Sequence, residues 1–304
     1  METILETAQL TKRYAQSCAL RNLDMKVEKG SIYGLIGRNG AGKTTLIRIV
    51  CGLQSPTAGT YRLWGTRSDN PAIVKMRRRM SAIVETPSIY MGFSAIYNVR
   101  QQYRILGRPS MDGAEDLLEL VGLGDTGRKK AASFSLGMKQ RLGIAIALAG
   151  DPDFLMLDEP TNGLDPQGII ELRELLLRLN RERQITLLIS SHNLDELSRI
   201  ATHYGFIDGG RMVREVAAEE VHAACRRCAR LTVSDAAALV RVLDKLHIEY
   251  TITAENQADV FGDWNLTETF AALRDAGCDV LNLTERSETL ESYYINLLGG
   301  ERHA

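Results

Sequence analysis

The sequence has no long hydrophobic run and no excess of charge of either sign. Its longest apolar stretches fall far short of the ~20 residues that a membrane-spanning helix needs. With 37 basic and 38 acidic residues in 304, it lacks the footprint of a polyanion-binding protein, so no nucleic-acid partner is expected. The first residues, Met-Glu-Thr-Ile-Leu-Glu, lack the basic and apolar regions of a signal peptide. We therefore expect a protein of the cytosol or of the inner face of a membrane.

Cysteine is also scarce. The five cysteines are scattered and odd in number, which argues against a disulfide framework. Cys225 and Cys228 form one Cys-x-x-Cys, but the sequence offers no second pair to complete a zinc site. We interpret them as two thiols on a helix face.

What the sequence does contain, over residues 1–216, is an alternation of apolar strands and helices. Fully apolar strands that alternate with helices predict an α/β fold with a parallel sheet covered on both faces. The expected strands are residues 4–10, 20–28, 31–37, 82–85, 154–158 and 186–190. Helices are expected from residue 43, over most of 94–149 (112–121 above all) and over 169–181, and a hairpin over 204–208 and 211–216.

Residues 217–304 have a different pattern and predict a small α+β module. Its elements suggest the order β-α-β-β-α-β of a ferredoxin-like domain. They are expected at 230–233, 236–246, 248–253, 259–262, 267–276 and 279–284, with Ser287 capping a final helix over 288–298. This module shows no catalytic constellation, so a dimerisation role and a regulatory role both remain open.

One loop has the pattern of a phosphate cradle. Gly37-Arg-Asn-Gly-Ala-Gly-Lys-Thr44 matches G-x-x-x-x-G-K-[ST] between an apolar strand and a helix. Its glycines let backbone N–H groups face phosphate oxygens, Lys43 supplies charge to the β- and γ-phosphates, and Thr44 can ligate Mg²⁺. The predicted nucleotide-binding residues here are Gly37, Arg38, Asn39, Gly40, Ala41, Gly42, Lys43, Thr44 and Thr45.

Three polar residues follow two other apolar strands. Asp158 and Glu159 end the run Phe-Leu-Met-Leu-Asp-Glu, and His192 closes Leu187-Leu-Ile-Ser-Ser-His192. The carboxyl ends of parallel strands form the ligand crevice of such sheets. We expect Asp158 to hold Mg²⁺ beside Thr44, Glu159 to polarise the attacking water, and His192 to bond the γ-phosphate.

A second anion-binding helix end is predicted far from the cradle. Ser133, Ser135 and Gly137 are small residues that precede the apolar helix pattern reaching Leu148. The free N–H groups and dipole at such a helix N-terminus attract anions. One chain therefore contains a full phosphate cradle and a further anion site.

These motifs, in this order, resemble the ATP-binding cassette (ABC) family of transporter ATPases. The resemblance covers residues 4 to about 216 and rests on Walker A (37–45), the signature (135–140), Walker B (154–158), Glu159, the D-loop around Asp165, and His192. It implies a P-loop NTPase cassette with a mostly parallel sheet, an antiparallel β subdomain and a helical signature subdomain, binding ATP and Mg²⁺.

The resemblance also accounts for the second anion site. In this family two cassettes associate head to tail, and each ATP lies between one subunit's Walker A and the other's signature. Ser135 and Gly137 are then expected to contact the γ-phosphate of a partner, either a second copy or a homologous cassette. Tyr14 matches the aromatic residue that stacks on adenine.

Two positions depart from the family pattern. The signature is Phe134-Ser-Leu-Gly-Met138, in which Met138 cannot make the hydrogen bonds of the usual glutamine. The lid glutamine corresponds to Glu85, which can ligate Mg²⁺ but adds negative charge near phosphate; a surface residue at a strand end is the alternative.

Three segments resemble bacterial bacitracin-export and lantibiotic-immunity ATPases: residues 85–90, 135–143 and 290–300. That resemblance implies an exporter subunit on the cytoplasmic side of the membrane, bound to a separate multi-span permease near residues 86–104. The basic run 75–79 is interpreted as a solvated face. A soluble ABC ATPase, a non-hydrolysing sensing subunit and an importer ATPase remain as alternatives.

Overall fold

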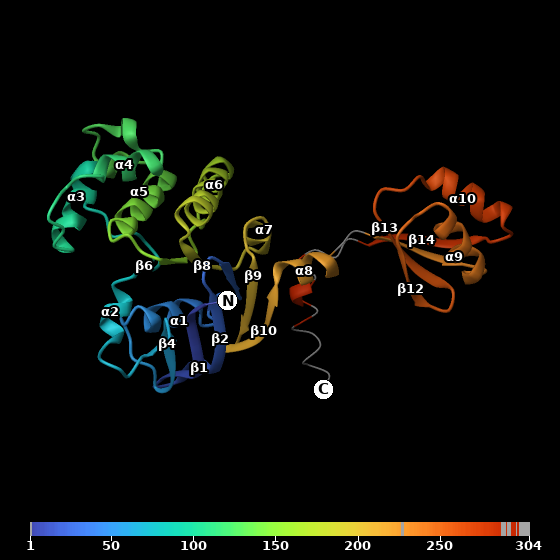
Figure 1. The fold of residues 1–304 in the computed structure, drawn as a ribbon, viewed down its shortest axis with the longest axis horizontal. Coiled ribbons are helices and arrows are strands. Elements are labelled where there is room, and N and C mark those ends of the chain that lie inside the picture. The colour runs from blue at the N-terminus through green and yellow to red at the C-terminus, as the bar shows by residue number, and fades with distance from the viewer. Residues whose placement is uncertain (1, 226–227, 287–289, 291–292, 296, 298–304) are drawn as a thin grey trace. The chain divides into compact units, whose positions relative to one another are not determined.

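The structure, a computed structural model, describes residues 2–225, 228–286, 290, 293–295 and 297. The chain forms two compact units, Met1–Ala218 and Glu219–Ala304, which are described separately (Figure 1). The expected cap Ser287 and most of the expected helix 288–298 lie outside the described residues. None of the described helices is long and apolar enough to cross a membrane.

A six-stranded sheet is the centre of the first unit. Its order is β10-β9-β3-β8-β7-β6, with every neighbouring pair parallel except β9 and β10. Every residue of β3, β7 and β8 is buried, which explains their uninterrupted apolar runs and confirms the predicted parallel sheet. The strands are β3 (Ile32–Ile36), β6 (Met80–Ile83), β7 (Phe154–Asp158), β8 (Thr186–Ser191), β9 (His203–Asp208) and β10 (Arg211–Ala217).

A second, antiparallel sheet has the order β2-β1-β4-β5. Its members are β1 (Thr3–Tyr14), β2 (Ser17–Glu28), β4 (Ala58–Leu63) and β5 (Thr66–Arg67). β1 and β2 run longer than expected because pairing continues through several bulges, past the apolar segments. The strand expected to reach Glu85 ends at Ile83, and Glu85 has a φ of 62°, which a strand cannot accommodate.

Helices surround the six-stranded sheet, and Figure 1 shows α3, α4 and α5 gathered as one group beyond β6. The expected helix 112–121 is shorter, since Gly113 has left-handed geometry and caps α4. The helices are α1 (Lys43–Val50), α2 (Ile73–Arg77), α3 (Ala95–Ile105), α4 (Ala114–Leu120), α5 (Leu136–Leu148), α6 (Pro166–Arg183), α7 (Leu194–Ser198) and α8 (Ala218–Ala224), with 3₁₀ turns at Gly124–Thr126 and Ala131–Ser133.

The second unit is a four-stranded antiparallel sheet with two helices, in the chain order β-α-β-β-α-β. The sheet order is β12-β13-β11-β14. Its core includes Leu231, Leu243 and Leu273, each fully buried. The elements are β11 (Cys228–Val233), α9 (Ala236–Lys245), β12 (Tyr250–Ala254), β13 (Gln257–Phe261), α10 (Leu266–Asp275) and β14 (Val280–Arg286).

Candidate nucleotide site

The predicted phosphate cradle is the loop that joins β3 to α1. Lys43 is 5% exposed, and its ammonium donates to the carbonyls of Gly37 (2.5 Å) and Arg38 (3.3 Å), so the loop wraps around it. Gly42 has a φ of 109°, and a Cβ there would lie 2.5 Å from the carbonyl oxygen of Ala19. Because the first N–H groups of a helix have no acceptor within it, those at the start of α1 are available to an anion.

Thr44 and Asp158 meet where β7 ends beside the cradle. The Thr44 hydroxyl donates to Asp158 Oδ2 at 2.7 Å, and the Ser190 hydroxyl donates to Asp158 Oδ1 at 2.6 Å. Asp158 pairs with Ser190 in the β7–β8 register, and both are almost fully buried. The carboxylate is therefore held by two hydroxyls from neighbouring segments.

Glu159 lies between a lysine and a histidine. Its Oε1 is 3.1 Å from Lys43 Nζ, and its Oε2 is 2.7 Å from His192 Nδ1. The backbone N–H of Glu159 donates to the Ser190 hydroxyl (3.0 Å), and the residue has a φ of 49°. That left-handed turn at the end of β7 aims Glu159 away from the direction of Asp158, so consecutive carboxylates reach different partners.

The oxygen donors present at this site fit Mg²⁺. One carboxylate and one hydroxyl converge, and Mg²⁺ characteristically takes one or two carboxylates and completes its shell with water and substrate phosphates. Among the described residues no group of three or more His, Cys, Asp or Glu side chains could hold a metal by itself. A metal at Thr44 and Asp158 would therefore take its remaining ligands from water and phosphate oxygens.

Ser135 and Asp165 each cap a helix. Ser135 accepts from the Met138 N–H (3.2 Å) at the start of α5, and Asp165 accepts from the Gly168 N–H (3.3 Å) at the start of α6. As acceptor in its cap, the Ser135 hydroxyl retains its own hydrogen for donation to an anion. The predicted second anion-binding helix end thus begins at Leu136.

Glu85 and Tyr14 make contacts with residues outside the Thr44–Asp158 pair. Glu85 is exposed and forms an ion pair with Arg48 on α1 (2.7 Å). The Tyr14 hydroxyl donates to Gln54 (2.7 Å), the Lys12 ammonium lies over the Tyr14 ring (5.3 Å from its centroid), and the residue is 44% exposed. Glu85 as a metal ligand and Tyr14 as a base-stacking residue stay predictions.

Sequence reasoning missed two elements of this site. Ser190 is the last residue but one of the apolar strand β8, and the register of two neighbouring parallel strands was the signal that could have paired it with Asp158. The other is the close packing of Pro87 against Gly143 on α5, where a Cβ added to the glycine would lie 2.4 Å from Pro87. Pro87 follows Glu85 by two residues, so its packing against Gly143 holds the loop that contains Glu85 against α5, the helix that starts at the signature.

A parallel sheet with a buried lysine cradle, a hydroxyl–carboxylate pair and a carboxylate–histidine pair defines a P-loop ATPase. The family model "ABC transporter" matches residues 20–162. The chain is 37% identical over 302 residues to the bacitracin transport ATP-binding protein BcrA of Enterococcus faecalis, covering 99% of this chain and 98% of that protein. It is 42% identical over 216 residues to the lantibiotic transport ATP-binding protein SrtF of Streptococcus pyogenes, covering 70% of this chain and 90% of that one.

A solved structure gives the same result for the fold. CbiO1 from Clostridium perfringens, part of an ABC transporter complex, superposes with a TM-score of 0.66 at 25% identity, covering 81% of this chain and 97% of its own. The chain belongs to the ABC transporter family as an ATP-binding, ATP-hydrolysing subunit. The predicted family and fold class are confirmed.

Proposed function

We propose that the chain powers an exporter of peptide antibiotics of the bacitracin type through a separate membrane permease, working at the cytoplasmic face of the membrane. The observation that carries this is the length of the match to BcrA. Similarity extends over 99% of the chain and so includes the second unit, whereas the match to SrtF covers 70%. The module predicted at 217–304 corresponds to the second unit, Glu219–Ala304, and its ferredoxin-like character is part of the proposal.

The contacts of the site support a role for each residue. Lys43 clamps the γ-phosphate, Thr44 and Asp158 hold Mg²⁺, Glu159 polarises the attacking water, and His192 orients Glu159. Mg²⁺ would neutralise charge that develops on the phosphates. The remaining contacts to ATP come from the cradle loop, the Tyr14 ring and, at the metal, Glu85.

A second cassette completes the site. The chain has one cradle and one signature, and the signature helix end begins with a capped serine that still carries a donor hydrogen. A head-to-tail pair would place Ser135, Gly137 and Asp165 against the partner's ATP. We propose a homodimer or a pair with a homologous cassette, which ATP closes and hydrolysis opens because the two nucleotides bind these states differently.

The permease is proposed to dock at a groove beside the Glu85 loop. A hollow of about 1040 Å³ lies between α2, β6, α3 and α5 and is lined in part by Leu53, Val74, Pro87 and Ile105. Leu53, Val74 and Ile105 are 67%, 55% and 61% exposed, and together they form an exposed aliphatic patch at the groove. The predicted docking segment, which includes the groove residue Ser88, also exposes four aromatic or sulfur-containing residues: Tyr90, Met91, Phe93 and Tyr97. Arg78 at the groove favours an apolar permease segment that carries acidic residues.

The test is capture of the tagged Glu159→Gln chain from its native membranes with ATP and Mg²⁺. The expected result is a multi-span protein at stoichiometric yield, and loss of bacitracin tolerance in cells whose only copy carries the same substitution. A soluble complex without a membrane protein would overturn the transporter assignment. Unchanged tolerance to bacitracin with a permease captured would overturn the cargo class alone.

A further inference from the structure

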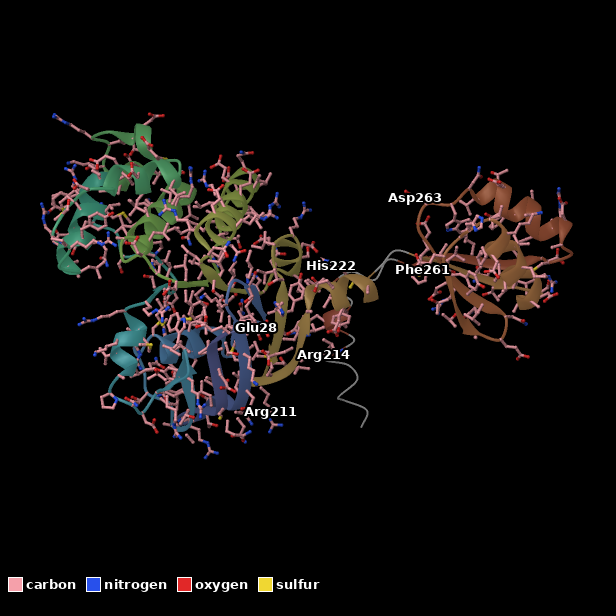
Figure 2. All side chains as sticks on the ribbon, in the orientation of Figure 1. Glu28, Arg211, Arg214, His222, Phe261 and Asp263 are labelled. Carbon is pink, nitrogen blue, oxygen red and sulfur yellow. The ribbon has the colours of Figure 1, made fainter. Side chains whose placement is uncertain are left out.

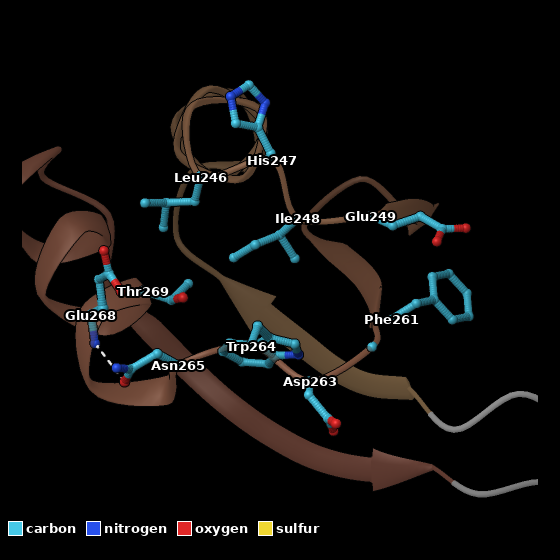
Figure 3. A pocket seen from close by; sticks show the side chains of 11 residues that line it. Leu246, His247, Ile248, Glu249, Phe261, Asp263, Trp264, Asn265, Glu268 and Thr269 are labelled. Carbon is cyan, nitrogen blue, oxygen red and sulfur yellow. Dashed lines mark hydrogen bonds between the residues drawn. The ribbon is translucent and has the colours of Figure 1, made fainter.

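Two charged residues that line the cavity of the second unit do not face it. The cavity has a volume of about 440 Å³, and the carboxylates of Glu249 and Asp263 point away from it (Figure 3). On the first unit, Arg211 and Arg214 of β10 are exposed to solvent (Figure 2). Charged residues that determine the position of a site residue are instead found at the loop that contains Glu85.

Glu85 is bonded to the helix that begins at the phosphate cradle. Its Oε1 accepts a hydrogen bond from Arg48 Nη2 at 2.7 Å. Arg48 follows Thr44 by four residues on α1, so the two side chains lie on the same side of that helix, one turn apart. The ion pair therefore holds the Glu85 carboxylate beside α1, about one helical turn beyond the hydroxyl that meets Asp158.

The backbone of the Glu85 loop is held independently of this pair. Glu85 has a φ of 62°, a left-handed conformation that few residues other than glycine adopt. Two residues later, Pro87 packs so closely against α5 that a Cβ at Gly143 would lie 2.4 Å from it. The position of the carboxylate then depends on side-chain contacts, and among the described residues Arg48 is the only one hydrogen-bonded to it.

The Arg48–Glu85 pair can bias the carboxylate and can also open. A guanidinium neutralises a carboxylate and orients its oxygens, which lowers the attraction of that carboxylate for another cation. The side chains of Arg48 and Glu85 are 35% and 62% exposed, and pairs this open to solvent shift an equilibrium by about fivefold at most. Arg48 and a metal beside Thr44 would therefore compete for one carboxylate.

We propose that Arg48 is a positioning residue that retains Glu85 and so limits the affinity of the ATP site for Mg²⁺. The inference rests on the role proposed above for Glu85 at the metal, and it does not depend on the permease or the cargo. Weakening the pair strengthens metal binding, and it does so only where residue 85 is a carboxylate.

The experiment measures nucleotide binding to the full chain with and without Mg²⁺. The probe is the fluorescent, non-hydrolysable ATP analogue mant-AMP-PNP, and the ratio of its affinity in Mg²⁺ to its affinity in EDTA gives the contribution of the metal. Arg48→Lys keeps the positive charge but lacks the terminal guanidinium nitrogen that makes the 2.7 Å bond. The expected result is a ratio about two- to fivefold higher in Arg48→Lys than in the natural chain.

The same substitution in a Glu85→Gln background separates retention from a general effect of charge. Glu85→Gln alone should lower the ratio, and adding Arg48→Lys to it should leave the ratio unchanged. Arg67→Lys is the matched control, because Arg67 forms an ion pair with Asp69 (2.8 Å) of similar exposure on another part of the first unit. No change in the ratio is expected for Arg67→Lys.

The outcomes distinguish this inference from the proposed role of Glu85. An unchanged ratio in Glu85→Gln would refute Glu85 as a metal ligand, and retention by Arg48 would fall with it. A lowered ratio in Glu85→Gln, together with an Arg48→Lys effect that is absent or equal in both backgrounds, would overturn retention alone. Arg48→Met is a second variant that removes both the bond and the charge; a ratio below that of the natural chain would also overturn retention.

Discussion

Lys43 and Glu159 form an ion pair, with Nζ and Oε1 3.1 Å apart and Lys43 almost fully buried. In the proposed mechanism, the ammonium that binds the γ-phosphate is therefore the one that pairs with the carboxylate proposed to polarise the attacking water. On that proposal, phosphate competes with Glu159 for Lys43, and a bound phosphate releases the Glu159 carboxylate for catalysis.

Glu159→Gln should separate these two effects. Turnover should fall by ~10²–10⁴-fold or more because the amide is no base. ATP affinity should rise, because an amide competes with phosphate for Lys43 less strongly than a carboxylate. Steady-state ATPase rates and nucleotide titration measure the two quantities. Glu182→Gln, on the exposed side of α6, is the control, and normal turnover in Glu159→Gln would refute the assignment.

Ser190→Ala should reveal how Asp158, the proposed metal ligand, is held. The substitution leaves one buried oxygen of Asp158 without its 2.6 Å hydrogen bond and removes the acceptor for the Glu159 N–H. We expect the Mg²⁺ concentration for half-maximal ATPase activity to rise roughly tenfold, while ATP binding without Mg²⁺ stays the same. Ser191→Ala is the matched control, since the Ser191 hydroxyl donates to the Asn193 carbonyl (3.1 Å) and accepts from the Asn193 N–H (2.9 Å). A shift of equal size in both variants would contradict the role of Ser190.

Gly143→Ala should loosen the Glu85 loop. Alanine normally favours a helix interior by about 1 kcal/mol over glycine, but here its Cβ would lie 2.4 Å from Pro87. Overpacking of this kind costs about 1–3 kcal/mol, so the Tm should fall and ATPase activity should fall with it. Adding Pro87→Gly removes the atoms in conflict and should restore part of the Tm. Gly92→Ala is the control, because no atom lies within 4 Å of a Cβ added there. A higher Tm in Gly143→Ala would show that Pro87 does not pack closely against position 143.

The pair Glu215 and Tyr33 predicts a pH dependence of stability. The Tyr33 hydroxyl donates to Glu215 at 2.6 Å, and desolvation of the carboxylate raises the pKa of Glu215 above 4.5. The folded state thus holds this proton more tightly than the unfolded state. Its contribution to stability is complete below pH 4.5 and is lost as pH rises through the raised pKa.

Glu215→Gln should therefore gain in Tm over the natural chain as pH rises. The difference should be smallest near pH 4 and larger at pH 7, because glutamine stays neutral throughout. Thermal unfolding at several pH values measures it, with exposed Glu219→Gln as control. A Tm difference that shrinks between pH 4 and pH 7 would show that the pKa of Glu215 is not raised in the folded protein.

Much of the first unit could be predicted because its apolar runs are local signals. β3, β7 and β8 are buried along their whole length, and the cradle sequence is specific to its conformation. β4 and β5 escaped prediction because half-exposed strands have weak apolar patterns. The end of β6 before Glu85 also escaped, since the left-handed backbone there gives no local signal in a residue other than glycine.

Within the site, the residues of strand ends could be predicted and their partners could not. That Asp158 and Thr44 lie together follows from the common edge of parallel strands. The bonds of Ser190 to Asp158, of Arg48 to Glu85 and of Tyr14 to Gln54 depend on register and on side-chain direction. These are set by tertiary packing, which local sequence patterns do not record.

The position of β3 in its sheet has a consequence for how the protein is made. β3 pairs with β8 on one side and β9 on the other, so its fully buried residues 32–36 gain their neighbours only when residues 186–208 are available. On the ribosome, the apolar strand and the Walker A loop that follows it must wait for more than half of the chain to emerge. During synthesis this apolar segment is thus exposed and prone to aggregation, and we expect chaperones to bind it until β8 and β9 have been synthesised.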